Sequence, residues 1–139
     1  MADSTQKKLK CIVVTPEQTV LDESVDFVAL PLYDGELGVL PGRAPLVARL
    51  GYGEMRTFTG DILARYYIDG GFLQIRDDAV SILTPRAIPA EKIDPATARS
   101  EIERVNEQVP TRPEDFQAKT IALTRARGQL QVARRAGKS

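Results

Sequence analysis

The chain contains no histidine and no tryptophan among its 139 residues, and it has one cysteine. Histidine is the commonest metal ligand and the commonest general base near neutral pH, so its absence argues against an enzyme. The lone Cys11 cannot form an internal disulfide, and its place in the apolar-rich run LKCIVVT predicts a buried small hydrophobic residue. We therefore expect no catalytic residues, no metal site and no cofactor.

Long apolar runs and an excess of charge are also missing. No stretch approaches the roughly 20 apolar residues that cross a bilayer, and the polar start MADSTQKKLK does not resemble a signal peptide. Nineteen basic residues balance nineteen acidic ones, so no global field favours nucleic acid or an anionic membrane surface. These absences predict a soluble, unexported protein that reaches a membrane only through a partner.

What the sequence does contain, up to about Thr84, is a series of short runs rich in Val, Ile, Leu, Tyr and Phe. The runs predict strands at residues 9–15, 24–32, 36–41, 53–59, 62–69, 71–77 and 79–84. Residues suited to tight turns separate them, at Asp34-Gly35, Asp69-Gly70-Gly71 and Asp77-Asp78. Such spacing is typical of an all-β sandwich or barrel with hairpin connections.

After Thr84 the pattern changes, through a linker whose prolines fix φ and remove backbone donors. A first helix is predicted to begin at Pro95 with Asp94 as its N-cap. Helical spacing then places four apolar residues on one face: Ala98, Ile102, Val105 and Val109.

A second helix is predicted after Pro110 and Pro113, with Glu114 and Asp115 in its first turn. Its apolar stripe consists of Phe116, Leu123, Ala126, Leu130 and Ala133. Over about 22 residues it would be about 33 Å long, and two such helices joined by a short loop form a hairpin. Helices of this length are marginal without packing, which predicts a conditional docking element.

The predicted fold class is therefore α+β, with an N-terminal antiparallel β-sandwich followed by a C-terminal antiparallel two-helix hairpin. We place the sandwich domain at residues 1–86 and the linker and hairpin at 87–139. Positive charge gathers in the second part, because residues 114–139 hold six Lys or Arg against two Asp or Glu.

The segment GELGVLPGRAP, residues 35–45, is the most distinctive stretch. From composition alone it is two tight turns around a short strand, and it matches neither glycine-rich phosphate-loop pattern. Its fuller form GELGVLPGRAPL, the later GGFLQI followed by AVSIL, and the C-terminal helical hairpin together resemble the epsilon subunit of F-type ATP synthase. The resemblance covers nearly the whole chain.

That resemblance implies a non-catalytic rotor subunit of the central stalk in a proton-translocating ATP synthase. Its partners would be the gamma subunit, the c-ring and the catalytic alpha/beta hexamer, at the cytoplasmic face of a bacterial membrane. The alternative is a stand-alone β-sandwich adaptor that has converged on similar turns, and an enzyme is a distant third.

The resemblance also implies that the edge of the sandwich carrying this segment faces the c-ring and the gamma subunit. The positions carried over are Glu36, Gly38, Leu40, Pro41, Gly42 and Arg43. If the resemblance is set aside, Glu36 is expected to be a solvated carboxylate in a turn. Relatives often have histidine at the place of Arg43, and arginine stays charged at all working pH values, so we expect no pH-sensitive contact there.

Some epsilon subunits bind ATP through an I/L-D-x-x-R-A pattern near the start of the first helix. Here the corresponding residues begin Ile93-Asp94 and end at Ala98, with Thr97 in place of the arginine. Arg99 follows two places later, about 200° further around the helix, so it is a poor substitute. We expect the chain not to bind ATP through Ile93, Asp94, Ala98 and Arg99.

In the family the second helix can extend along gamma and inhibit ATP hydrolysis through basic residues that meet an acidic segment of the hexamer. The residues that would do this here are Arg125, Arg127, Arg134 and Arg135. The alternative is a solvated helix face whose cations favour the helix C-terminus.

Overall fold

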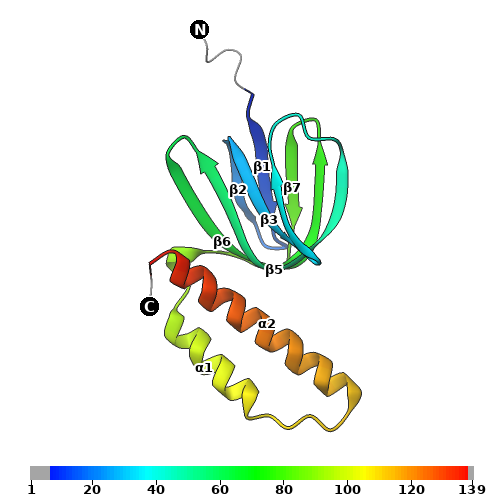
Figure 1. Ribbon diagram of the computed structural model, residues 1–139, viewed down its shortest axis with the longest axis vertical. Helices are drawn as coiled ribbons and strands as arrows, with labels where there is room; N and C mark the ends of the chain where they lie inside the picture. The colour runs from blue at the N-terminus through cyan, green and yellow to red at the C-terminus, as the bar shows by residue number, and fades with distance from the viewer. Residues whose placement is uncertain (1–6, 138–139) are drawn as a thin grey trace.

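The computed structural model describes residues 7–137, which form a β-sandwich with two helices packed beneath it (Figure 1). The strands are β1 (Leu9–Val14), β2 (Thr19–Val25), β3 (Phe27–Leu32), β4 (Gly35–Val39), β5 (Leu46–Thr59), β6 (Ile62–Arg76), β7 (Ala79–Leu83) and β8 (Ala87–Pro89). A 3₁₀ turn, Ala90–Lys92, leads to α1 (Pro95–Asn106) and α2 (Pro113–Arg135). The predicted combination of sandwich and helical hairpin is confirmed.

The two layers of the sandwich share their longest strands. The strand order is β2-β1-β7-β6-β5-β3-β4, with β8 also paired to β6. The second half of β6 pairs with β7 and its first half pairs with β8, so β5 and β6 bend from one layer into the other. All pairs are antiparallel except β1 with β7, which is parallel. The predicted antiparallel sandwich therefore contains one parallel pair.

Glycines allow the bends in the two long strands. A Cβ at Gly51 would lie 2.6 Å from the carbonyl oxygen of Leu32. At Gly71, where φ is +108°, a Cβ would lie 2.0 Å from the carbonyl oxygen of Leu83. Since L side chains rarely adopt that φ and backbone cannot yield, the second glycine of GGFLQI is required by the close approach of two strands.

The main core lies between the layers and is built from strand residues alone. Its buried members are Leu9, Cys11, Val13, Leu21, Val25, Val28, Leu30, Val39, Leu50, Met55, Ile68, Leu73, Ile75, Val80 and Ile82. Cys11 is buried as predicted, and burial, followed by the charge of Glu23, raises the pKa of its thiol to about 12. It is an inert core residue.

Three strand segments were not predicted: residues 19–23 of β2, the first half of β5, and β8 in the predicted linker. Residues 19–23 of β2 carry charged side chains, as expected for a strand at one end of the sheet order, and therefore lack a clear apolar pattern. The first half of β5 follows the proline-rich loop directly and was likewise missed. β8 pairs with β6 at residues 87–89, just after the predicted domain boundary at residue 86, which stays a prediction.

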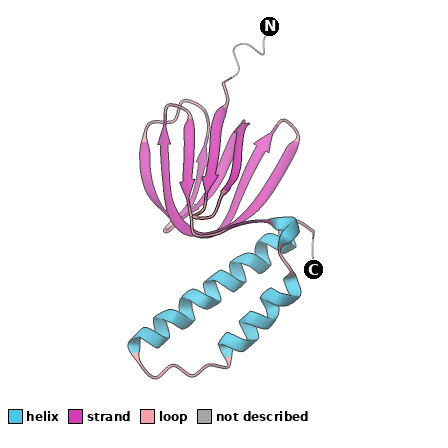
Figure 2. Cartoon of the chain, turned by 180° about the vertical axis from the view of Figure 1, so that it is seen from behind, coloured by secondary structure: helices cyan, strands magenta, loops and turns pink. Residues whose placement is uncertain are grey.

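The helices begin where the sequence predicts. Asp94 caps α1, accepting a hydrogen bond from the backbone N–H of Ala96 at 3.0 Å. α1 ends at Asn106, however, and Val109 is 84% exposed, so its predicted place on the buried face is wrong. Phe116, in the first turn of α2, is exposed as well. Both lie at the hairpin loop, the end that extends beyond the sandwich (Figure 2).

Candidate functional site at the edge strand and the helical hairpin

The distinctive GELGV segment is β4, the strand at one end of the sheet order. Within residues 7–137 it pairs with β3 alone, with Glu36 opposite Pro31 and Gly38 opposite Ala29. A Cβ on Gly38 would lie 3.0 Å from the ring of Phe27, so this glycine makes room for an aromatic side chain. An open strand edge offers backbone groups and side chains to a second protein.

The loop after β4 is fastened at the end of the sandwich away from the helices (Figure 1). Gly42, with φ +88°, donates its backbone N–H to Oδ1 of Asp78 at 2.7 Å, and Asp78 belongs to the turn between β6 and β7. Leu40 and Arg43 are exposed beside it. The candidate contact residues are thus spread along the edge, with Glu36 nearer the hairpin and Gly42 at the far end.

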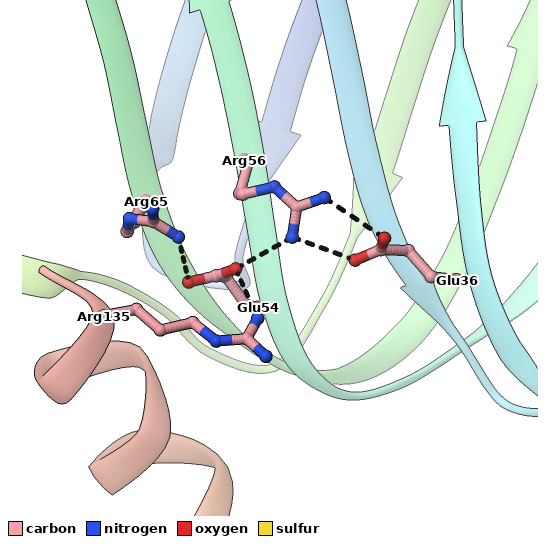
Figure 3. A network of polar contacts seen from close by, with 5 residues as sticks. All are labelled: Glu36, Glu54, Arg56, Arg65 and Arg135. Carbon is pink, nitrogen blue, oxygen red and sulfur yellow. Dashed lines mark hydrogen bonds and ion pairs between the residues drawn. The ribbon is translucent and has the colours of Figure 1, made fainter.

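Glu36 is joined to a network of charged side chains that reaches the end of α2 (Figure 3). Nη1 and Nη2 of Arg56 donate to its two carboxylate oxygens, each at 3.1 Å. Arg56 Nη1 also donates to Oε1 of Glu54 at 3.0 Å. Glu54 accepts two further hydrogen bonds, from Arg65 at 2.8 Å and from Arg135 of α2 at 3.0 Å.

Glu54 is the centre of this network, and its side chain is only 5% exposed. Burial acts to raise the pKa of its carboxyl, but the hydrogen bonds from Arg56, Arg65 and Arg135 outweigh burial and hold the pKa below its usual range. Glu54 is therefore an ionised group that needs its arginines.

A second anchor holds the middle of α2. Arg125 Nε lies 3.0 Å from Oδ1 of the buried Asp69, and its guanidinium lies 5.4 Å from the ring centroid of Tyr52. The hydroxyl of Tyr67 donates to the same Asp69 oxygen at 2.8 Å. Burial, followed by the hydrogen bond to Asp69, raises the pKa of Tyr67, which keeps the hydroxyl protonated as a donor.

Between these anchors the helix rests on a small apolar cluster separate from the main core. Its buried members are Tyr67, Ala90, Ile93, Val132 and Ala133. A Cβ on Gly128 would lie 3.0 Å from the ring of Tyr67, so α2 approaches closely there. α2 lies between the sandwich and α1 in both views (Figures 1 and 2). Docking of the hairpin thus depends on five buried side chains and two ionic anchors.

The four arginines predicted to act together do not share one environment. Arg125 and Arg135 bind buried carboxylates of the sandwich. Arg127 and Arg134 are exposed, and neither forms an ion pair within the described part of the chain. The first two hold the hairpin in place, and the last two are free for a partner.

The residues of the predicted nucleotide pattern are not brought together. Ile93 is buried in the small apolar cluster, and Asp94 is occupied by its capping hydrogen bonds to Ala96 and Thr97. A groove of about 320 Å³ between the helices is lined by Arg86, Thr97, Ala98, Glu101, Ala122, Arg125, Ala126 and Gln129. Arg99 is absent from its lining, which holds two guanidinium groups, Arg86 and Arg125, and one carboxylate, Glu101.

Sequence reasoning missed a strip of apolar side chains on the outside of the sandwich. Val47, Phe72 and Leu83 are 71%, 60% and 58% exposed. Phe72 lies opposite Leu83 in the sheet, and both line an apolar groove of about 400 Å³, together with Pro16. The sequence signal was partial, because the outward positions of GFLQI and AVSIL are mixed: Phe72 and Leu83 are apolar, whereas Gln74 and Ser81 beside them are polar. Exposed apolar patches of this kind mark interaction surfaces.

Among residues 7–137, no helix is long and apolar enough to span a membrane. The same residues contain no group of three acidic or cysteine side chains arranged to hold a metal ion. The same part of the chain presents an open strand edge, an apolar strip and a helical hairpin with exposed arginines, all of which are suited to binding a partner.

Comparison with known proteins agrees with this fold. Residues 8–90 match the family described as ATP synthase, Delta/Epsilon chain, beta-sandwich domain. The ATP synthase epsilon chain of Rhodopirellula baltica is 49% identical over 126 residues, which cover 91% of this chain and 98% of the relative. The epsilon chain of Syntrophobacter fumaroxidans is 38% identical over 91% of this chain and 96% of the relative.

Two solved structures are similar as well. One is a chain of a cryo-EM structure of the Euglena gracilis mitochondrial ATP synthase, described as OSCP/F1/c-ring. Its TM-score is 0.79 at 26% sequence identity, and the match covers 94% of this chain and 81% of that chain. The other, the central stalk and c-ring of the Tetrahymena thermophila enzyme, has a TM-score of 0.72 at 12% identity, which shows a shared fold.

The chain belongs to the ATP synthase delta/epsilon family, as a relative of its epsilon chains. Relatedness over nine-tenths of the chain overturns the alternative of a stand-alone adaptor that converged on similar turns. The expected membership of the ATP synthase complex is confirmed.

Proposed function

We propose that this chain is a non-catalytic rotor subunit of a proton-translocating ATP synthase, which couples the catalytic hexamer to the c-ring and regulates hydrolysis through its hairpin. The observation that carries the proposal is the hairpin's separate attachment: Val132 and Ala133 of α2 pack on the buried Tyr67, Ala90 and Ile93, and two ionic anchors hold the helix outside the main core. An element attached in this way is suited to release as a unit.

Two surfaces of the sandwich would serve two partners. The open edge, Glu36 to Arg43, offers a carboxylate, backbone groups and an anchored loop to the polar loops of the c-ring. The apolar strip of Val47, Phe72 and Leu83 offers the desolvated centre that a lasting interface with the gamma subunit needs.

Regulation would come from the released hairpin. Arg127 and Arg134 are already exposed, and release adds Arg125 and Arg135 to the free charges of α2. Several basic side chains on one helix could meet an acidic segment of the hexamer and block hydrolysis. Their effect should weaken with salt, because single exposed pairs contribute only about 0.2–1 kcal/mol and are screened.

The place of action would be the cytoplasmic face of a bacterial membrane, reached only through the complex. Both relatives named above come from bacteria, and the described residues contain no helix that could span a membrane. We propose no cofactor and no ATP binding, since Thr97 stands where the family pattern has arginine and Arg99 does not line the groove between the helices.

Co-purification with separately tagged gamma subunit tests the proposed partner surface. Replacing Phe72 and Leu83 by serine should weaken retention at least about tenfold, because truncating buried anchors costs the most at interfaces. The control is Ile62→Ser, which removes an apolar side chain that is somewhat more exposed, at 70%, near the turn between β5 and β6. Equal retention of both variants would contradict the assignment of the strip to gamma.

A further inference from the structure

The ring-facing edge and the docked helix share one ionic network. Glu36 lies on β4, Arg56 and Glu54 on β5, and Arg135 in the last turn of α2 (Figure 3). Every link is a hydrogen bond between charged groups, at 3.0 or 3.1 Å. Within residues 7–137, Glu36 and Arg135 are connected through Arg56 and Glu54 and share no direct ion pair.

The charges of the network are unequal. It contains two carboxylates, Glu36 and Glu54, and three guanidinium groups, Arg56, Arg65 and Arg135. Arg135 and Arg56 both donate through Nη1 to the same Glu54 oxygen, so they compete for one acceptor. Glu36 relieves this competition, because it engages both terminal nitrogens of Arg56.

We propose that Glu36 controls how firmly the hairpin is docked: a basic group of a partner that draws Glu36 away from Arg56 weakens the hold of Glu54 on Arg135. The proposal rests on the function proposed above, in which the edge at Glu36 meets a partner and the hairpin is released. The new element is that contact of a basic partner group with Glu36 favours release of the hairpin.

The sign of the effect follows from electrostatics. Without Glu36, Arg56 turns its whole charge toward Glu54, and one buried carboxylate then faces three cations. Because Arg56 and Arg65 belong to the same sheet and cannot leave, the repulsion falls on Arg135, which a mobile helix carries. When Arg135 departs, Glu54 faces two guanidinium groups instead of three, and the repulsion among the cations falls.

The coupling is reciprocal, as any linkage of two equilibria must be. A released hairpin leaves Arg56 free to satisfy Glu54 and so loosens its grip on Glu36. The edge then offers a more available carboxylate to a basic partner. Contact at the edge and release of the hairpin therefore strengthen each other through four side chains.

Amide hydrogen exchange of α2 in the isolated full-length chain tests the linkage without any partner. Glu36→Gln removes the charge from the network, and Asp34→Asn removes the same charge from the neighbouring turn as its control. Arg135→Gln breaks the link at the helix, and Arg134→Gln is its control. A fifth variant combines Glu36→Gln with Arg135→Gln, and strand amides report whether each variant stays folded.

We expect Glu36→Gln and Arg135→Gln each to accelerate exchange in the last turns of α2 by about two- to tenfold over their controls. The double variant should exchange no faster than Arg135→Gln alone, since both changes break one chain of contacts. Multiplied effects in the double variant, or a Glu36→Gln rate equal to that of Asp34→Asn, would overturn the linkage.

This outcome is separable from the fate of the proposed function. If the hairpin has no effect on ATP hydrolysis by the assembled complex, the regulatory role fails while the exchange data still decide the linkage. If the two substitutions act independently, the linkage fails and the regulatory role is untouched.

Discussion

A few residues of this chain carry strain or charge that the rest of the fold must accommodate. Glu54 is buried among three arginines, and Gly71 occupies a backbone conformation that other residues rarely adopt. Substitution of either residue is therefore expected to destabilise the folded chain.

Replacing Glu54 by Gln should destabilise the folded chain by about 1–3 kcal/mol, because three guanidinium groups lose their ionised acceptor. Denaturant unfolding measures the effect. Glu114→Gln, an exposed carboxylate in the first turn of α2, is the control and should change stability by less than about 1 kcal/mol. A similar loss in both variants would mean that the network adds nothing specific.

The same residue predicts a pH dependence. Since the pKa of Glu54 is lower in the folded chain than its ordinary value of 4.5, the unfolded chain binds the proton more readily. Its contribution to stability is therefore fully present above pH 4.5 and is lost as the pH falls through the lower folded value. Unfolding measured from pH 6 downward should show a shallower decline for Glu54→Gln than for the unaltered chain.

Gly71→Ala should be the most damaging of the glycine substitutions, costing at least about 2 kcal/mol, because a Cβ would meet backbone at 2.0 Å and φ is +108°. Gly60→Ala is the matched control, since its φ is +60° but its Cβ would meet open space. Thermal unfolding of the two variants compares the cost of a clash with the cost of φ alone. Equal melting temperatures would contradict the close approach at Leu83.

At the scale of elements, the sequence predicted what local patterns determine. Asp94-Pro95 predicted the start of α1 correctly, and the apolar runs predicted most strands, because capping and alternation act over a few residues. The end of α1 was missed since Val109 continues the helical spacing although the backbone has already turned toward Pro110.

The anchors of the hairpin could not be predicted, because they join residues that are distant in the chain. Glu54 and Arg135 are 81 positions apart, and the sequence around each residue does not indicate which residue it pairs with. A buried carboxylate in a strand run was the available signal: Glu54 stands among the apolar and aromatic residues of GYGEMRTF. The sequence alone therefore treated four arginines of α2 as one group, although two of them hold the helix in place.

That division predicts different effects within α2. In the assembled complex, Arg127→Gln with Arg134→Gln should raise ATP hydrolysis, because it removes charge from the hairpin without weakening its docking. The increase should shrink at high salt, where the charges are already screened. Deletion of residues 114–139 sets the upper limit of the increase. No change in either variant at low and high salt would leave α2 without an inhibitory role.

At the scale of the whole molecule, we propose that the sandwich and the hairpin are separate units of stability. The main core contains strand residues only, while the hairpin adds its own cluster around Tyr67. A chain ending at Ala90, just after β8, should therefore remain a folded β domain. Circular dichroism and protected strand amides would show this, and an unfolded fragment would contradict the two-part organisation.

The parallel pairing of β1 with β7 also sets the order in which the chain can be completed during synthesis. β1 lies between β2 and β7, so the layer that contains it stays open on one side until residues 79–83 are available. The β1–β2 hairpin leaves the ribosome long before its neighbour exists, and pairings between distant strands form slowly. The sandwich can therefore be completed only after more than half of the chain has been synthesised, because its first strand is enclosed only when its seventh is available.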